Sequence, residues 1–287
     1  MEEITRKPAV AGSFYPAEKA LLDREISGLI NQSEKITLKG KVKILIVPHA
    51  GIIFSGPTAT AGFKQIEGQN YTRVIILGAS HQAWFDYAAV FNQGVWETPL
   101  GKVEIDEDIA SAIIDKDAKI IADTAVHNEE HSLEVELIFL QKVLKKFKIV
   151  PILLSQTTDE LINLLAGKIA QNLDHQTLLV VSSDLSHYPP YEVAQKVDGE
   201  TIKAILSGQL LVFEKTIADL ESTGWPNLQT AACGQKAVRV ALRVSEILKL
   251  KFIKIKYQNS GDSPASGPAG NKSQVVGYAS IIGVSSK

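Results

Sequence analysis

Residues 178–190 of this chain read LLVVSSDLSHYPP, an apolar run followed at once by a dense polar segment. Leu178 to Val181 has the apolar, β-branched character of a strand that is covered on both faces. Asp184 and His187 come directly after it, where that strand must end. In open α/β sheets, ligand-binding and catalytic groups gather at the carboxyl ends of the strands. The stretch therefore predicts a buried sheet with a site at its edge.

Two other apolar runs end in the same way. Residues 43–47 lead into PHAG at 48–51, and residues 73–77 lead into GASH at 78–81. Neutral imidazole is a common protein ligand for iron, copper and zinc, and two histidines with an anionic third ligand make a typical open metal site. A histidine left uncoordinated beside the metal would act as a base. Three strand-like runs thus each deliver one histidine to what we predict is a single rim: His49, His81 and His187.

Apolar strand-like runs alternate with amphipathic helical patterns along the whole chain. This alternation predicts parallel βαβ units and an α/β fold, a sheet with helices on both faces. The chain shows no internal repeat and no linker, so we expect a single domain over residues 1–287. Pro57 is expected to open a helix that reaches about Glu67. Pro151 suggests an irregular or edge strand at 148–154.

The bulk composition excludes several classes of protein. A formal net charge of −2 leaves no basic stripe for nucleic acid. No apolar run reaches the roughly 18 residues of a membrane span, and the first residues have no apolar core of a secretory signal. The single cysteine excludes an internal disulfide, so we expect a cytoplasmic protein. Neither a phosphate-binding glycine loop nor a G-x-S-x-G elbow occurs.

Asp184 and Cys233 each allow more than one interpretation. Asp184 would orient an imidazole, contact substrate or ligate a metal, or it would only cap the turn after the strand. Cys233 lies at the start of a predicted helix, where the helix dipole lowers the pKa of a thiol and favours the metal-binding thiolate. The alternative is a small buried apolar residue.

The segment HNEEH at 127–131 matches the H-x-x-E-H zinc peptidase pattern, with Glu130 as the candidate base. The same residues are also typical of a loop-to-helix junction, where glutamates favour the first turn. In that case Glu130, His131 and Glu134 would line or brace the rim of the site. The loop at 258–273 is rich in Gly, Ser and Pro, and we expect it to be mobile or ordered only by a ligand.

Six motifs follow one another along nearly the whole chain: PAVAGSFYP, VPHAGIIFSG, GASH, EEHSLEVEL, SSDLSHY and ACG. In this order they resemble the Memo family. The resemblance implies the fold of the class III extradiol dioxygenases, an α/β core with a non-haem iron site at its rim. In those enzymes two histidines and a glutamate hold Fe(II), and another histidine is the acid/base.

Carried over by motif, the resemblance implies that His49 and His81 are metal ligands and that His187 is the acid/base. Asp184 matches the aspartate of the family's SSDL-x-H segment. Cys233 stands where the dioxygenases have the ligand glutamate. A thiolate ligand favours copper or a differently tuned iron, so either Fe(II) or copper is expected. The resemblance also implies partners from a radical-SAM system.

These observations favour a metal-dependent oxidoreductase that acts on an unknown substrate. The alternative is a catalytically silent binding module that recognises a small molecule, a peptide or a partner protein through the same pocket. Trp84, Phe85 and Trp225 are the aromatic candidates for such a surface, together with the 258–273 loop. A zinc peptidase using His127 and His131 is the third hypothesis.

Overall fold

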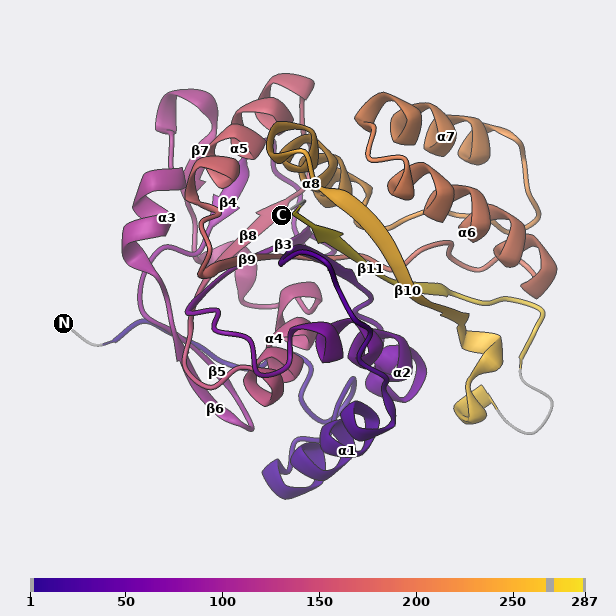
Figure 1. The fold of residues 1–287 in the computed structure, drawn as a ribbon, viewed down its shortest axis with the longest axis horizontal. Helices are drawn as coiled ribbons and strands as arrows, with labels where there is room; N and C mark the ends of the chain where they lie inside the picture. The colour runs from indigo at the N-terminus through magenta and orange to yellow at the C-terminus, as the bar shows by residue number, and fades with distance from the viewer. Residues whose placement is uncertain (1–2, 267–270, 286–287) are drawn as a thin grey trace.

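The computed structural model describes residues 3–266 and 271–285 of the chain. A mixed β-sheet crosses the centre, with helices on both of its faces (Figure 1), so the predicted α/β class is confirmed. In chain order its strands are β2 (Val42–Val47), β3 (Arg73–Ala79), β4 (Ala88–Val90), β7 (Ile120–Ala122), β8 (Lys148–Leu154), β9 (Thr177–Ser182), β10 (Lys251–Asn259) and β11 (Gly277–Val284). A smaller sheet contains β1 (Thr5–Arg6), β5 (Val95–Thr98) and β6 (Gly101–Glu104).

The strands of the main sheet lie in the order β10-β11-β2-β9-β3-β8-β4-β7. The four central strands β2, β9, β3 and β8 run parallel to one another. β11 pairs antiparallel with β2, and β4 pairs antiparallel with β8. Since the central strands point the same way, their carboxyl ends share one edge of the sheet, where the polar segments of the sequence follow.

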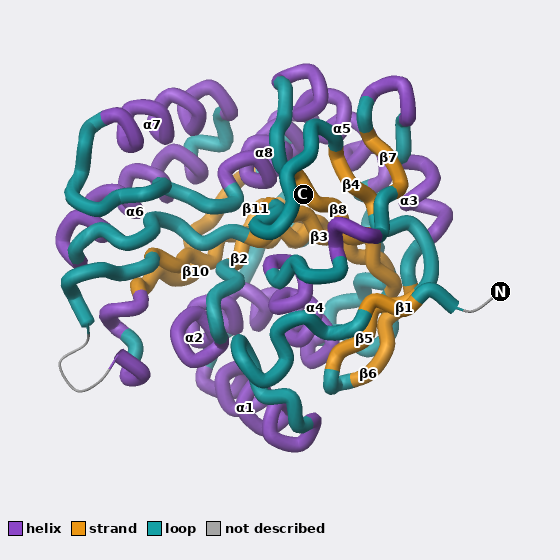
Figure 2. Tube along the Cα trace, turned by 180° about the vertical axis from the view of Figure 1, so that it is seen from behind, coloured by secondary structure: helices purple, strands orange, loops and turns teal. Residues whose placement is uncertain are grey.

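The helices form two layers, which Figure 2 shows from the opposite side. One layer contains α1, α2 and α4, and the other contains α3, α5, α6, α7 and α8. Along β2, Ile44 and Ile46 face the second layer, whereas Leu45 and Val47 face the first. This alternation explains the uninterrupted apolar run of that strand. The helices are α1 (Lys19–Gln32), α2 (Ile52–Phe63), α3 (Glu107–Ile113), α4 (Ser132–Val143), α5 (Asp159–Asn172), α6 (Tyr191–Leu206), α7 (Leu210–Ser222) and α8 (Gln235–Leu248).

The helix expected to begin at Pro57 begins earlier, at Ile52, so that prediction was wrong. Proline has no N–H to donate to the carbonyl four residues back, which here belongs to Ile53. The hydroxyl of Ser263 donates to that carbonyl at 2.8 Å. A distant side chain therefore replaces the missing helix bond and allows Pro57 to lie inside α2.

Pro151 does not mark an edge strand, because β8 lies between β3 and β4. Its carbonyl accepts from the N–H of Phe91, just beyond the end of β4. Residues that face each other in this way normally exchange two hydrogen bonds, and proline can supply only one. Pro151 is thus tolerated where the pairing with β4 ends.

The N-terminal segment is tied to the start of α4 by Glu134. This buried carboxylate pairs with Arg6 and accepts from the backbone N–H groups of Ala9 and Val10 and from the hydroxyl of Tyr15. The guanidinium of Arg6 also donates to the carbonyls of His127 and Glu130. The segment PAVAGSFYP at 8–16 is therefore anchored beside the carboxyl edge of the sheet.

The loop at 258–273 contains two short 3-10 turns, Ser260–Asp262 and Pro264–Ser266. Residues 267–270 of that loop lie outside the described residues, and its mobility stays a prediction. Asp106 caps α3, because its carboxylate accepts from the N–H of Ile109. Within the described ranges, every helix is too short or too polar to cross a bilayer.

Candidate metal centre at the carboxyl edge of the sheet

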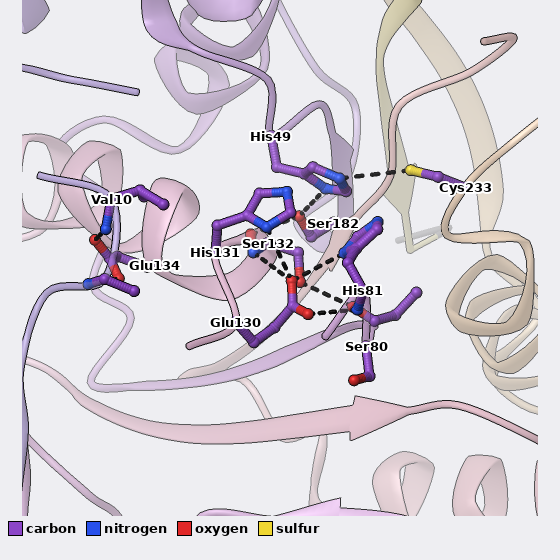
Figure 3. Close-up of polar contacts among 12 residues, drawn as sticks. Val10, His49, Ser80, His81, Glu130, His131, Ser132, Glu134, Ser182 and Cys233 are labelled. Atoms are coloured by element: carbon purple, nitrogen blue, oxygen red, sulfur yellow. Dashed lines mark hydrogen bonds and ion pairs between the residues drawn. The ribbon is translucent and has the colours of Figure 1, made fainter. Parts of the chain in front are cut away.

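The loops that follow β2, β3 and β9 bring His49, His81, Asp184 and His187 to the same edge of the sheet. The rings of His49 and His81 have centroids 5.1 Å apart. The pKa of His49 is lowered by burial and by the nearby imidazoles of His131, His81 and His187. The pKa of His81 is raised, because its contact with Glu130 outweighs burial. Two of the three strand-end histidines, His49 and His81, therefore lie side by side (Figure 3).

His49 is buried and held at both its backbone and its ring. Its N–H donates to the Asp184 carboxylate at 2.9 Å, and its Nδ1 lies 2.8 Å from the hydroxyl of Ser182. Its other ring nitrogen, Nε2, lies 3.5 Å from Sγ of Cys233. His49 is thus the residue at which the imidazoles meet the thiol.

The hydroxyl of Ser182 determines which nitrogen of His49 carries the proton. Its oxygen lies 2.8 Å from the carbonyl of Ser132, 2.8 Å from Nδ1 of His49 and 2.7 Å from Oε1 of Glu136. A hydroxyl has one hydrogen and two lone pairs. The carbonyl can only accept, so it takes that hydrogen, and both Nδ1 of His49 and Oε1 of Glu136 must donate. His49 therefore presents a free lone pair at Nε2, and Glu136 is a neutral acid.

The environment of Glu136 agrees with a protonated, neutral carboxyl group. Its carboxyl is fully buried on α4, and burial raises its pKa well above the ordinary value for glutamate. Its second oxygen, Oε2, has no hydrogen-bond partner among the described residues. An ionised carboxylate with one bare oxygen would be costly to bury, whereas a neutral acid is not.

Glu130 orients two further imidazoles. Its Oε1 lies 2.9 Å from Nδ1 of His81 and 3.3 Å from Nδ1 of His131, and it also accepts from the N–H of Ser132. Burial raises the pKa of Glu130, but hydrogen bonding to His81 and the charges of both histidines outweigh burial and lower it to about 2. The ionised carboxylate thus accepts from Nδ1 of His81 and lies within ion-pair distance of Nδ1 of His131, so that both rings turn Nδ1 toward it.

His131 belongs to the centre of the site, although the sequence interpretation placed it only at the rim or in a peptidase motif. Its ring centroid lies 4.7 Å from that of His81 and 5.3 Å from that of His49. The signal that could have found it is the glutamate directly before a histidine at the start of a helix. The hydroxyl of Ser132 donates to the carbonyl of Ala79 and ties that helix start to the end of β3.

The peptidase arrangement is absent from this segment. α4 begins only at Ser132, so His127 and His131 do not share a helix face. The ring of His127 is fully buried, with Nε2 3.2 Å from the carbonyl of Ala89 and with Trp96 packed against it. His127 is therefore a structural residue, and the hypothesis of a zinc site built from this pair was wrong.

Cys233 lies directly before Gly234, the N-cap of α8. Its sulfur accepts from the N–H of Asp184 at 3.2 Å. Gly234 allows this approach, since a Cβ at that position would lie 2.5 Å from the carbonyl oxygen of Ser182. Burial and the Asp184 carboxyl raise the pKa of the thiol, which is the opposite of the effect expected from the helix start alone. A bound cation would reverse that preference by replacing the proton.

His187 lies beside these residues without a bond to Asp184. Its backbone N–H donates to the carbonyl of Thr230, and its Nε2 is buried with no partner in the described part of the chain. Burial lowers the pKa of His187 to about 4 and raises that of Asp184 to about 7. A neutral ring with an unpartnered nitrogen is suited to accept or donate a proton.

Two sets of donor atoms lie close enough to hold one ion, with all atoms of a set within 4.8 Å of one another. The first contains His49, His81 and His131, and the second contains His49, Asp184 and Cys233. The predicted ligands His81 and Cys233 fall in different sets, and His49 belongs to both. Imidazole, carboxylate and thiol are all ligands that transition metals accept, so the residues fit a metal ion.

A hollow of about 390 Å³ adjoins His187, whose carbonyl accepts from the N–H of Gln229 in the lining. Two larger hollows, of about 980 and 770 Å³, lie at the opposite strand ends and beside β10. They contain none of the site histidines. The hollow beside His187 is lined by Tyr188, Asn227, Leu228, Gln229 and Gln274.

Among solved structures, the chain is similar to the crystal structure of uncharacterized protein JW3007 from Escherichia coli K12. The TM-score is 0.49 at 13% sequence identity, over 83% of this chain and 99% of that one.

Sequence relatives are much more similar. A MEMO1 family protein of Thermoplasma volcanium is 32% identical over 278 residues, which cover 96% of this chain and 97% of that protein. A MEMO1 family protein of Caldivirga maquilingensis is 35% identical over 290 residues, covering 97% and 98%. The sequence model of the family described as Memo-like protein matches residues 6–282. The resemblance seen in the six motifs thus extends along the whole chain, which belongs to the Memo family.

Proposed function

We propose that this Memo family protein binds one transition-metal ion through His49, His81 and Cys233 and is a metal-dependent oxidoreductase. The observation that supports it best is the 3.5 Å separation between Nε2 of His49 and Sγ of Cys233. Nitrogen and sulfur ligands on one tetrahedral ion, at about 2.0–2.1 and 2.3 Å from it, lie about 3.5 Å apart. The two side chains need little movement to share an ion.

The surroundings of the ligands favour binding. The Nδ1 atoms of His49 and His81 are taken by Ser182 and Glu130, so each ring offers Nε2 in a fixed orientation. The side chain of His81 is 26% exposed, which leaves a route for substrate to this face. When bound, iron or copper supplies redox capacity and open positions for a substrate.

His187 would then accept a proton from the substrate or donate one to it. It is neutral at pH 7, because its pKa is lowered to about 4, and its free Nε2 has no competing partner in the residues described. Asp184 supports the site by holding the backbone of His49 and donating its own N–H to Cys233. In this proposal Asp184 is a positioning residue, and His187 contacts the substrate.

Metal analysis tests the proposal. Protein purified without chelator should carry iron or copper, and His49→Ala and Cys233→Ala should each lose most of it. Unchanged metal content in Cys233→Ala would remove the thiol from the ligand set. Metal-dependent oxygen consumption should disappear in His187→Ala while the metal content stays. Oxygen consumption that persists in this variant would contradict the role of His187.

A binding module is the second candidate, and the exposed residues around the site favour it. Trp84, three residues after His81, is 84% exposed; Ile53, at the start of α2, and Tyr188, in the loop after β9, are also exposed. The hollow beside His187 is lined mainly by uncharged polar side chains. Tight binding of a peptide or metabolite without turnover, lost in Trp84→Ala, would support this function. Pull-down with proteins of a radical-SAM system would test the partners implied by the resemblance.

A further inference from the structure

His131 has no part in the proposed ligand set, yet its ring faces those of His49 and His81 (Figure 3). The three ring centroids lie 4.7, 5.1 and 5.3 Å apart. Three imidazoles bound to one tetrahedral ion at metal–nitrogen distances of about 2.0–2.1 Å have centroids about 5 Å apart. The spacing of these rings is therefore the spacing that one ion requires.

Polar contacts give the three rings the same orientation. Nδ1 of His81 donates to Glu130, and Nδ1 of His49 donates to Ser182. Nδ1 of His131 lies 3.3 Å from the same Glu130 oxygen. In its neutral form each ring therefore presents an Nε2 lone pair, and a lone pair can only accept. Three acceptors gathered in a largely buried site repel one another unless a cation lies between them.

Cys233 approaches His49 from the side away from His131 (Figure 3). Its sulfur falls in a donor set with Asp184 and His49 that contains neither of the other two histidines. His49 belongs to both sets but has one free nitrogen. A cation in one set therefore excludes a cation from the other.

We propose that His131 is a metal ligand, and that His49, His81 and His131 form an all-imidazole site that alternates with a sulfur-containing site at His49, Asp184 and Cys233. This inference rests on metal binding at His49, as in the proposed function, but it divides the proposed ligand set: His81 and Cys233 hold different ions, and Asp184 becomes a ligand of the sulfur-containing site. Imidazole suits divalent ions such as Co²⁺ and Zn²⁺, whereas thiolate selects Cu⁺. The identity of the ion therefore decides which of the two sites is occupied.

Anaerobic titrations with Co²⁺ and with chelator-buffered Cu⁺ test the division. Visible absorption reports the coordination of Co²⁺, and competition with the chelator gives the Cu⁺ affinity. His131→Ala should weaken Co²⁺ binding at least about ten-fold, since even the loss of a residue that only orients a ligand costs 10–100-fold. It should leave Cu⁺ affinity within two-fold of the wild type. Cys233→Ser should do the reverse.

Two controls make the result specific. His175→Ala removes an exposed imidazole at the opposite end of β9 and should change neither affinity. His131→Gln keeps most of the side-chain volume against Phe14, whose ring lies 4.9 Å away, so it separates loss of a ligand from loss of packing. It should lose Co²⁺ affinity as His131→Ala does.

Unchanged Co²⁺ affinity and spectrum in both His131 variants would overturn the role of His131. Equal loss of both ions in His131→Ala and in Cys233→Ser would overturn the division into two sites. His49→Ala distinguishes these failures from failure of the proposed function. If the His49→Ala variant still binds both ions, the proposed metal-binding function is contradicted. If it loses both ions while the His131 variants bind them normally, only the role of His131 is contradicted.

Discussion

The carboxyl of Glu136 lies 2.7 Å from the hydroxyl of Ser182, with both side chains fully buried. Because Ser182 already donates to a carbonyl, Glu136 must donate to Ser182, and the same hydroxyl then accepts from Nδ1 of His49. A neutral glutamate on α4 thereby fixes the tautomer of a histidine that it does not touch.

Replacement of Glu136 tests this relationship. Glu136→Gln keeps an N–H donor toward Ser182 and should leave the free energy of unfolding within about 1 kcal/mol of the wild type. Glu136→Leu removes the donor and should cost about 1–3 kcal/mol. Urea denaturation measures the energies, and nitrogen NMR of His49 in metal-free protein reports the tautomer. A glutamine variant as unstable as the leucine variant would show that Glu136 is ionised.

Asp198 should make stability depend on pH. Its carboxyl is buried, accepts from the N–H of Ser186 at 2.9 Å and from the hydroxyl of Tyr257 at 2.8 Å, and burial raises its pKa to about 7. Between about pH 4 and pH 7 the folded protein keeps a proton that the unfolded chain releases. Rising pH through this window therefore removes stability, by at most about 1.4 kcal/mol per pH unit from this group.

Asp198→Asn should abolish that contribution, since asparagine keeps polar atoms toward both partners but does not titrate. Urea midpoints of the wild type and the variant, measured from pH 4 to pH 8, should diverge in the variant's favour as pH rises. Parallel profiles would show that Asp198 titrates in its ordinary range.

Replacement of Arg6 should lower the free energy of unfolding strongly, because its charged side chain is buried. It is buried against Glu134 and over the ring of Trp96, with its guanidinium carbon 4.6 Å from the centroid. Arg6→Leu leaves the carboxylate buried without its counter-charge and should cost about 3–5 kcal/mol. Lys7→Ala is the matched control, because its ammonium is 70% exposed and pairs with Glu97, and such pairs contribute about 1 kcal/mol or less. Equal losses in the two variants would contradict the role of burial.

The hydrogen bond from Ser263 to the carbonyl of Ile53 should matter only while residue 57 is proline. Ser263→Ala leaves that carbonyl without its donor and should cost about 1–2 kcal/mol. In a Pro57→Ala background the N–H of residue 57 can donate instead, so the same change should cost much less. A double-mutant cycle of unfolding free energies measures the coupling. Additive effects would show that the two residues act independently.

The sequence allowed the sheet and most of the site to be predicted, because strand-end polar residues carry a local signal. His49 and His81 each follow an apolar run that forms a buried strand. The change from apolar to polar residues marks the end of each strand in the sequence. His131 has no such signal, since its position depends on how the start of α4 packs on β3 through Ser132. The same holds for Pro57, whose place inside α2 depends on Ser263, far along the chain. Local pattern identifies the elements, and tertiary contacts decide which of them meet.

β2, the strand that comes directly before His49, lies between β9 and β11, and both of these come from later parts of the chain. During synthesis on a ribosome, β2 emerges early but cannot be flanked on both sides until β11 has left the exit tunnel. Long-range pairing of this kind is slow, and an apolar strand with bare edges is prone to aggregate. His49 thus follows a strand that stays open to such contacts until β11 is available to pair with it.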